Sequence, residues 1–294
     1  MRSDARQAYL LLTLATLFWA GNTIIARALS DTVPPITLAF LRWVVATLIV
    51  LPFAWTALKQ DASLIRRALP QLFMFSVLGV SSFNTLLYHA AHTTGANNIA
   101  LLQTAMPPFI VMLGWLLYRE HASRLVIIGI TLGMIGAAVI ILHGDLDALA
   151  TLQFVSGDMW MLLAVFLYAL YSVLLPSRPP IQPMSFIFVT FALGALSLWP
   201  LYLWEAGNAA PVQWDGKIVA AIGYVALFAS ALAYFCWNRG LELVGAQRAG
   251  VFICFLPAFT AVLAALLLDE PLYSYHVVGA VFIIGGFILV NLRK

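Results

Sequence analysis

Amide and aromatic side chains recur in this chain at the spacing of one helix turn, a pattern that suits the binding of a small molecule. Asn84 and Tyr88 are four residues apart, and Tyr234 and Asn238 repeat the pair in the opposite order 150 residues later. Residues four apart lie on one face of a helix. Trp237 adds an indole beside Asn238. Because aromatic rings attract apolar groups and cations while amides bond carboxylates and ammonium groups, we interpret both faces as ligand-binding.

Three other apolar segments carry polar or aromatic candidates for the same site. Trp19 and Asn22 are three residues apart and so share one face of the first segment. Tyr171 lies on the corresponding face in the second half of the chain, and Gln103 lies one turn before a pair of prolines. Asn22 fits a second interpretation equally well, in which its amide bonds a neighbouring helix.

Prolines at matching positions of the two halves, Pro107 and Pro257, are expected to break two helices near their middle. Proline has no N–H, so each one frees a backbone carbonyl and bends the helix. Met106 precedes the first break and Phe255 lies just before the second. We interpret these four residues as gating or hinge positions, and a kink that serves packing is compatible with that role.

Three titratable side chains are candidates for proton transfer: His89, His92 and Glu242. The two histidines are three residues apart near the end of one helix. No third histidine, cysteine or carboxylate shares their turn, so the spacing lacks the ligand count of a metal site. We expect no metal and no cofactor.

The composition requires these residues to be held by membrane-spanning helices. The chain has 294 residues, 63% apolar and 9% charged, with a mean hydropathy of +0.97. Soluble domains carry about 25% charged and 45–50% apolar residues. Apolar runs of about twenty residues predict transmembrane helices, whereas the strands of a membrane barrel alternate over about ten. We therefore expect an all-α integral membrane protein.

Charged residues, prolines and glycines divide the chain into ten expected spans. They cover residues 7–29, 36–58, 69–92, 96–118, 124–143, 157–177, 183–204, 216–240, 246–268 and 275–292. Most of the 15 Lys and Arg residues fall on the face that both termini share. The positive-inside rule therefore places both termini in the cytoplasm. Arg42 lies inside a span, and we interpret it as a structural residue bonded to backbone carbonyls.

The second half of the chain repeats the first. At an offset of 150 residues, GANNIALLQTAMPPF from residue 95 aligns with GAQRAGVFICFLPAF from residue 245, and the shared landmarks include Glu120 with Glu270. Five spans per half is an odd number, so the second copy must cross the membrane upside down. We expect two inverted five-helix repeats, residues 1–146 and 147–294. Inverted repeats are typical of secondary transporters, whose substrate sites lie near the midplane between the halves.

A known family shows the same order of motifs. WAGNTIIAR in the first span, Arg42 within TLAFLRWVVATLIVLP, and GANNIALLQTAMPPF followed by a glutamate, with its echo in the second half, resemble the EamA type of the drug/metabolite transporter superfamily over essentially the whole chain. Members export small metabolites, including amino acids. The resemblance therefore implies an inner-membrane efflux carrier, and it leaves the substrate open.

An uncharged cavity of aromatic and amide groups favours neutral or zwitterionic molecules. We expect export of amino acids, aromatic and apolar ones foremost, by alternating access; drugs, nucleosides or other neutral or cationic metabolites, or a passive channel, are the alternatives. Anchoring of tyrosine and tryptophan at the membrane surface is the alternative to binding. The expected substrate-binding residues are Trp19, Asn22, Tyr88, Gln103, Tyr171, Tyr234, Trp237 and Asn238.

The sequence also bears on energy source and partners. A G-x-x-x-x-G-K-[ST] loop is absent, so ATP is not expected as the direct fuel. No strongly apolar mid-span carries the Asp or Glu that proton-coupled carriers usually hold. We expect uniport or exchange first, with proton antiport through His89, His92 or Glu242 as the alternative. We expect a small-molecule substrate and membrane lipid as partners, no nucleic acid and no enzyme activity. The sequence leaves the oligomeric state open and is compatible with a monomer.

Overall fold

The computed structural model describes residues 2–29, 32–91, 93–94, 96–145, 155–209, 211–267 and 270–291. Within these residues, ten helical segments are long and apolar enough to cross a membrane, which confirms the expected all-α fold. In the first half the segments are α1 (Arg2–Leu29), α2 (Pro35–Arg67), α3 (Leu69–Ser76) with η1 (Val77–Ser81) and α4 (Ser82–Ala91), α5 (Ala96–Gln103) with α6 (Met106–Tyr118), and α7 (Arg124–Ile141).

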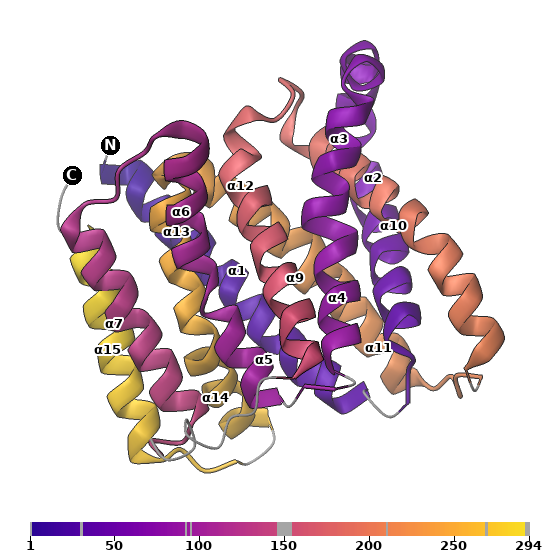
Figure 1. The fold of residues 1–294 in the computed structure, drawn as a ribbon. Coiled ribbons are helices and arrows are strands. Elements are labelled where there is room, and N and C mark those ends of the chain that lie inside the picture. The colour runs from indigo at the N-terminus through magenta and orange to yellow at the C-terminus, as the bar shows by residue number, and fades with distance from the viewer. Residues whose placement is uncertain are drawn as a thin grey trace.

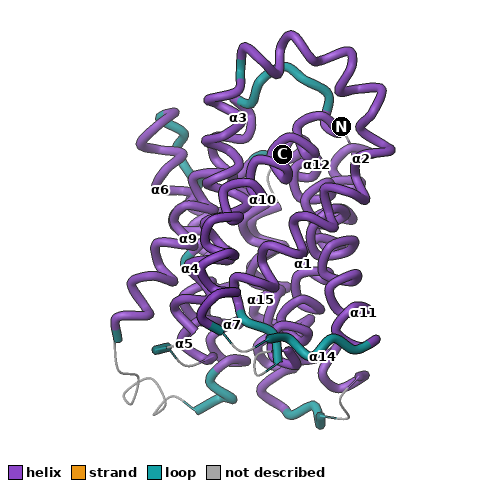
Figure 2. Tube along the Cα trace, turned by 90° about the vertical axis from the view of Figure 1, so that its right-hand side faces the viewer, coloured by secondary structure: helices purple, strands orange, loops and turns teal. Residues whose placement is uncertain are grey.

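The second half follows the same plan. Its segments are α9 (Ser156–Leu174) with η2 (Leu175–Ser177), α10 (Pro183–Asn208), α11 (Gly216–Tyr224) with η3 (Val225–Leu232) and α12 (Ala233–Val244), α13 (Ala246–Gly250) with η4 (Val251–Phe255) and α14 (Leu256–Leu267), and α15 (Ser274–Asn291). The beginning of α1 and the end of α15 lie at the same end of the bundle (Figure 1). Most loops gather at the two ends of the bundle (Figure 2).

Helix α2 is longer than the sequence analysis predicted. The expected span ended at residue 58, whereas the helix continues to Arg67 and projects beyond its neighbours (Figure 1). The extension from Lys59 is rich in residues of good helix propensity and holds no glycine or proline. The charged residues that end an apolar span therefore do not end the helix.

Helices α7 and α15 pack closely through glycines. A Cβ atom on Gly129 would collide with the carbonyl oxygen of Gly286, and one on Gly136 would collide with that of Gly279. The residue numbers rise along one helix as they fall along the other, so the two helices run antiparallel. Gly129 is also the sequence equivalent of Gly279, and Gly136 that of Gly286. The contact therefore maps onto itself when the halves are exchanged, as an inverted repeat requires.

The other main helix pairings are also preserved when the two halves of the chain are exchanged. Helix α2 packs on α10, its own counterpart. Helix α1 packs on α12 and α14, and the equivalent contacts join α9 to α4 and α6. Each half thus packs its first span against spans of the other half. The hydrophobic core is shared between the halves, and its largest fully buried side chains include Trp43, Trp237 and Tyr171.

Two carboxylates secure the pairing of α2 with α10 in a reciprocal way. Glu205, near the end of α10, accepts hydrogen bonds from the backbone N–H groups of Ile36 at 3.0 Å and Thr37 at 2.6 Å, at the start of α2. Asp61, near the end of α2, accepts one from the N–H of Gln182 at 2.9 Å, just before α10. Free N–H groups at a helix start favour a negative partner. Each helix therefore supplies the cap for the other.

Candidate functional site

The third and eighth spans each contain a π-helical segment, at positions that overlap when the halves are aligned. These are η1 and η3. A π turn inserts an extra residue into the helix and disturbs its regular hydrogen bonds. The sequence analysis predicted both spans as continuous helices and missed the π segments, because neither segment holds a proline.

Carbonyl groups of the two π segments accept hydrogen bonds from side chains on other helices. The hydroxyl of Tyr234 donates to the carbonyl of Gly79 in η1. The indole N–H of Trp19 donates to the carbonyl of Ala229 in η3 at 3.1 Å, and Arg42 donates to the same oxygen at 3.2 Å. The π segments therefore fix three side chains at the centre of the bundle.

The fourth and ninth spans are broken at the prolines, as the sequence predicts. Helix α5 ends at Gln103 and α6 begins at Met106, immediately before Pro107. The 3₁₀ segment η4 ends at Phe255, and α14 begins directly before Pro257. Irregular backbone at this depth is tolerated where it is buried or lines a cavity.

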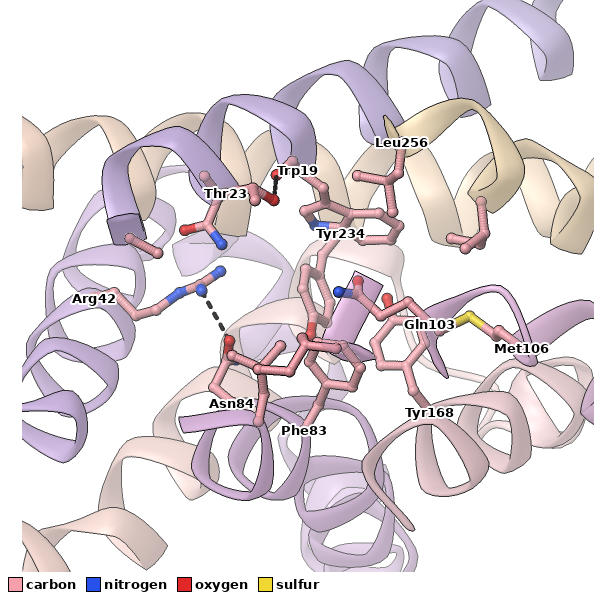
Figure 3. A pocket seen from close by; sticks show the side chains of 15 residues that line it. Trp19, Thr23, Arg42, Phe83, Asn84, Gln103, Met106, Tyr168, Tyr234 and Leu256 are labelled. Atoms are coloured by element: carbon pink, nitrogen blue, oxygen red, sulfur yellow. Dashed lines mark hydrogen bonds between the residues drawn. The ribbon is translucent and has the colours of Figure 1, made fainter. Parts of the chain in front are cut away.

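A cavity of about 140 Å³ lies between these interrupted spans. Engineered protein cavities of about 150 Å³ hold a ligand the size of benzene, so the space suits a small molecule. Spans from both halves form the wall, and Figure 3 shows their side chains converging. The lining residues are Trp19, Asn22, Thr23, Ala26, Arg42, Phe83, Asn84, Leu87, Ile99, Gln103, Met106, Tyr168, Tyr234, Ile253 and Leu256.

One end of the cavity is polar and is organised around Arg42. This guanidinium is 2% exposed and donates to the side chains of Asn84 at 3.1 Å and Ser230 at 3.0 Å, besides the carbonyl of Ala229. It also lies 4.7 Å from the ring centroid of Trp43. The expected bond from Arg42 to a backbone carbonyl is present, but the residue also faces the cavity (Figure 3).

The middle of the cavity is aromatic. Trp19 lies edge-on to Tyr168 and Tyr234, with ring centroids 5.9 Å and 6.3 Å apart. The rings of Trp43 and Phe191 also pack against Tyr234, each nearly perpendicular to its ring. Perpendicular aromatic packing is favourable and leaves the ring positions well defined. These rings therefore support one another in the aromatic wall.

Three of the expected binding residues lie outside the cavity, in a packed layer on the side of the termini. The hydroxyl of Tyr171 donates to Asn238 at 2.9 Å, and the indole of Trp237 donates to Ser172 at 3.3 Å. Tyr171 and Trp237 are 1% and 0% exposed. By contrast, Thr23 at the opposite end of the cavity is exposed. The described residues thus close the site toward the termini, and its lining at the opposite end includes an exposed side chain.

Of the expected binding residues, Trp19, Asn22, Gln103 and Tyr234 line the cavity together with the expected gating residue Met106. The backbone of Tyr88 belongs to α4, and its side chain and His92 lie outside the described residues.

The remaining expected residues lie away from the cavity. Phe255 stacks on Phe259 with centroids 5.8 Å apart. His89 is exposed and packs edge-on against Trp160. Glu242 forms an ion pair with Arg178 at 2.7 Å. The roles in gating and proton transfer stay predictions.

The list of expected binding residues did not include Arg42, Asn84 or Tyr168, although Asn84 lies on a helix face that was interpreted as ligand-binding. A signal existed for each: Arg42 is a charge within an apolar span, Asn84 is one turn from Tyr88, and Tyr168 is three residues before Tyr171. The apolar lining residues, such as Phe83 and Leu87, could not be predicted from the sequence, because apolar side chains occur on every face of a membrane helix.

Known proteins share both the sequence and the fold of this chain. A profile of the EamA-like transporter family matches residues 6–142 and again residues 155–292. The chain belongs to the EamA-like transporter family. It is therefore a multi-pass membrane transporter within the drug/metabolite transporter superfamily, as the motif order suggested.

Relatives of this EamA-like transporter occur in bacteria and archaea. It is 29% identical to an uncharacterized transporter of Archaeoglobus fulgidus, over 98% of both chains. It is 27% identical to the uncharacterized transporter YetK of Bacillus subtilis, over 98% of this chain and 87% of YetK. A solved crystal structure superposes with a TM-score of 0.79 at 18% identity, covering 97% of this chain and 96% of the other, which shows a shared fold.

Proposed function

We propose that this EamA-like transporter is a secondary carrier that exports small metabolites, most of all amino acids with aromatic or apolar side chains. The observation that carries the proposal is the cavity itself, which is lined by spans of both halves and combines a polar end with an aromatic middle. Aromatic rings supply apolar contact and attract an ammonium group, and the amides of Asn22 and Gln103 supply hydrogen bonds.

Alternating access is the mechanism that fits the packing. The layer of Tyr171, Trp237 and Asn238 closes one side of the cavity, whereas Thr23 on the other side is exposed. In an inverted repeat, an exchange of conformations between the halves closes the accessible side and opens the closed one. With both termini in the cytoplasm, as the charge distribution predicts, the described conformation faces outward.

No carboxylate is among the lining residues that the structure describes. Of the candidates for proton coupling, Glu242 is ion-paired with Arg178 and Arg239 away from the cavity. This arrangement favours uniport or exchange. Flux measured at a constant substrate gradient should continue when a protonophore collapses the proton gradient, and loss of flux would instead support antiport.

The deciding experiment is counterflow of radiolabelled amino acids into proteoliposomes that hold the purified protein and unlabelled substrate. We expect saturable exchange of phenylalanine, tryptophan and leucine. Trp19→Ala should reduce it, because Trp19 lines the cavity, whereas Trp204→Ala should not, because Trp204 is 65% exposed on the outside of the bundle. Absence of exchange for every amino acid would contradict this substrate class. Conductance without saturation would favour a channel.

A further inference from the structure

Arg42 is a buried cation whose described partners are all neutral. Its three nitrogens donate to a hydroxyl on Ser230, an amide oxygen on Asn84 and the carbonyl of Ala229. By contrast, Arg178 and Arg239 each form an ion pair with Glu242. A charge that is buried without an opposite charge is costly, so it marks a functional position in a membrane protein.

The hydrogen bonds of Arg42 leave part of the guanidinium free. The group has five N–H donors. Its single Nε–H is used by Ser230, and each terminal nitrogen has one bond, to Asn84 and to Ala229. One N–H therefore remains on each terminal nitrogen. Two such groups are what a carboxylate binds in the strongest arginine pairs.

The cavity has the polarity of a molecule with a carboxylate at one end and an apolar group at the other. In Figure 3, Arg42 and Asn84 lie at one end, and Met106 and Leu256 lie at the other, with the ring of Tyr234 between them. Trp43 packs on the guanidinium and holds it in place. An apolar chain or ring would extend from the carboxylate along the aromatic wall.

We infer that Arg42 is a carboxylate-binding residue, and that the transporter selects small monocarboxylates with an apolar side group. This inference rests on the proposed function and narrows it to substrates that carry a carboxylate. The ammonium group of an amino acid is dispensable, because the described lining residues include no acidic side chain that could pair with it. Cationic drugs and polyamines are disfavoured by the charge of Arg42. The rival explanation is that Arg42 only links α2 to η3.

Four probes of similar shape separate these explanations: L-phenylalanine, 3-phenylpropionate, L-phenylalaninamide and phenethylamine. Binding to the purified full-length protein is measured from the thermal shift that each probe produces, and inhibition of counterflow is measured beside it. We expect both carboxylates to bind at least about tenfold more tightly than the amide and the amine, as the loss of a charge-assisted bond implies. Equal binding of all four, or no binding of the carboxylates, overturns the inference.

Variants assign the preference to Arg42. Arg42→Gln should abolish it, and Arg42→Lys should restore it in part, since lysine keeps the charge without the two-pronged geometry. Arg66→Gln is the matched control, because Arg66 lies exposed on the same helix; it should keep the preference. Unchanged preference in Arg42→Gln would show that the residue is only structural.

A second variant tests the inference without removing Arg42. Asn84→Asp places a carboxylate where an amide oxygen now lies 3.1 Å from the guanidinium. The new internal anion should occupy Arg42 and weaken carboxylate binding at least about tenfold while the protein stays folded. Carboxylate binding at wild-type strength in a folded Asn84→Asp protein overturns the inference. If 3-phenylpropionate binds but no amino acid is exchanged, the proposed function fails and the carboxylate site stands.

Discussion

Gly79 and Ala229 lie at equivalent positions of the two halves, and the carbonyl oxygen of each accepts a hydrogen bond from a side chain on another helix. Each lies in a π segment, the former in η1 and the latter in η3. The π segments of both halves thus bond side chains that line the cavity, namely Trp19, Arg42 and Tyr234. If the two halves exchanged conformations, the carbonyls of Gly79 and Ala229 would each still accept a hydrogen bond, but from a different side chain.

Removal of the Tyr234 hydroxyl tests the contact in η1. Tyr234→Phe keeps the ring but leaves the buried carbonyl of Gly79 without this donor. An unsatisfied buried acceptor costs about 1–3 kcal/mol. We expect a lower thermal midpoint of the detergent-solubilised protein. Tyr273→Phe, at a side chain that is 54% exposed, is the control and should not change the midpoint. Equal midpoints for wild type and Tyr234→Phe would contradict the role of this bond.

Two neighbouring glycines of α15 should respond oppositely to a methyl group. Gly286→Ala forces a Cβ atom into the carbonyl oxygen of Gly129, whereas Gly285→Ala meets nothing within 4 Å. Overpacking typically costs about 1–3 kcal/mol. We expect Gly286→Ala to unfold at lower temperature and Gly285→Ala to unfold at or above the wild-type temperature. The reverse order would contradict the antiparallel contact of α7 with α15.

The reciprocal caps between α2 and α10 should stabilise the contact between the halves. Glu205→Gln weakens three hydrogen bonds at the start of α2, two to backbone N–H groups and one to the Thr37 hydroxyl at 2.8 Å. Loss of a helix cap costs about 0.5–2 kcal/mol. Thermal unfolding should therefore begin earlier in this variant than in Glu270→Gln, whose side chain is exposed. Identical curves for the two variants would argue against the cap.

Accessibility of engineered cysteines tests the orientation and the closed layer. Cys236 and Cys254 are both buried and are first replaced by alanine. A cysteine at Thr23, which is exposed, should react with a membrane-impermeant thiol reagent added outside the cell. A cysteine at Ser172, which is 0% exposed, should react only from the cytoplasmic side, when the layer of Tyr171, Trp237 and Asn238 opens.

Two labelling results would contradict these expectations. Reaction of the Thr23 position only from the cytoplasm would reverse the predicted orientation of the termini. Reaction of the Ser172 position from outside would contradict alternating access.

The sequence was most informative where a physical rule acts along the chain. Apolar length determines the number of spans, and Pro107 and Pro257 break their helices because a proline lacks an N–H wherever it lies. Part of the cavity lining was among the expected residues: Trp19, Asn22, Gln103 and Tyr234 line the cavity. Tyr171, Trp237 and Asn238 share the same helices but face a packed layer, because helical spacing gives the face of a side chain and not what lies opposite.

What the sequence alone determined is the number of membrane spans and the division into two related halves, since both follow from local composition and from self-similarity. What only the tertiary structure decided is which polar groups meet. Arg42 comes together with Ser230 although they are 188 residues apart. The carbonyls of the π segments likewise bond side chains that are distant in the sequence. The partners of a buried charge depend on packing between helices, so the chemistry at the polar end of the cavity emerged only with the fold.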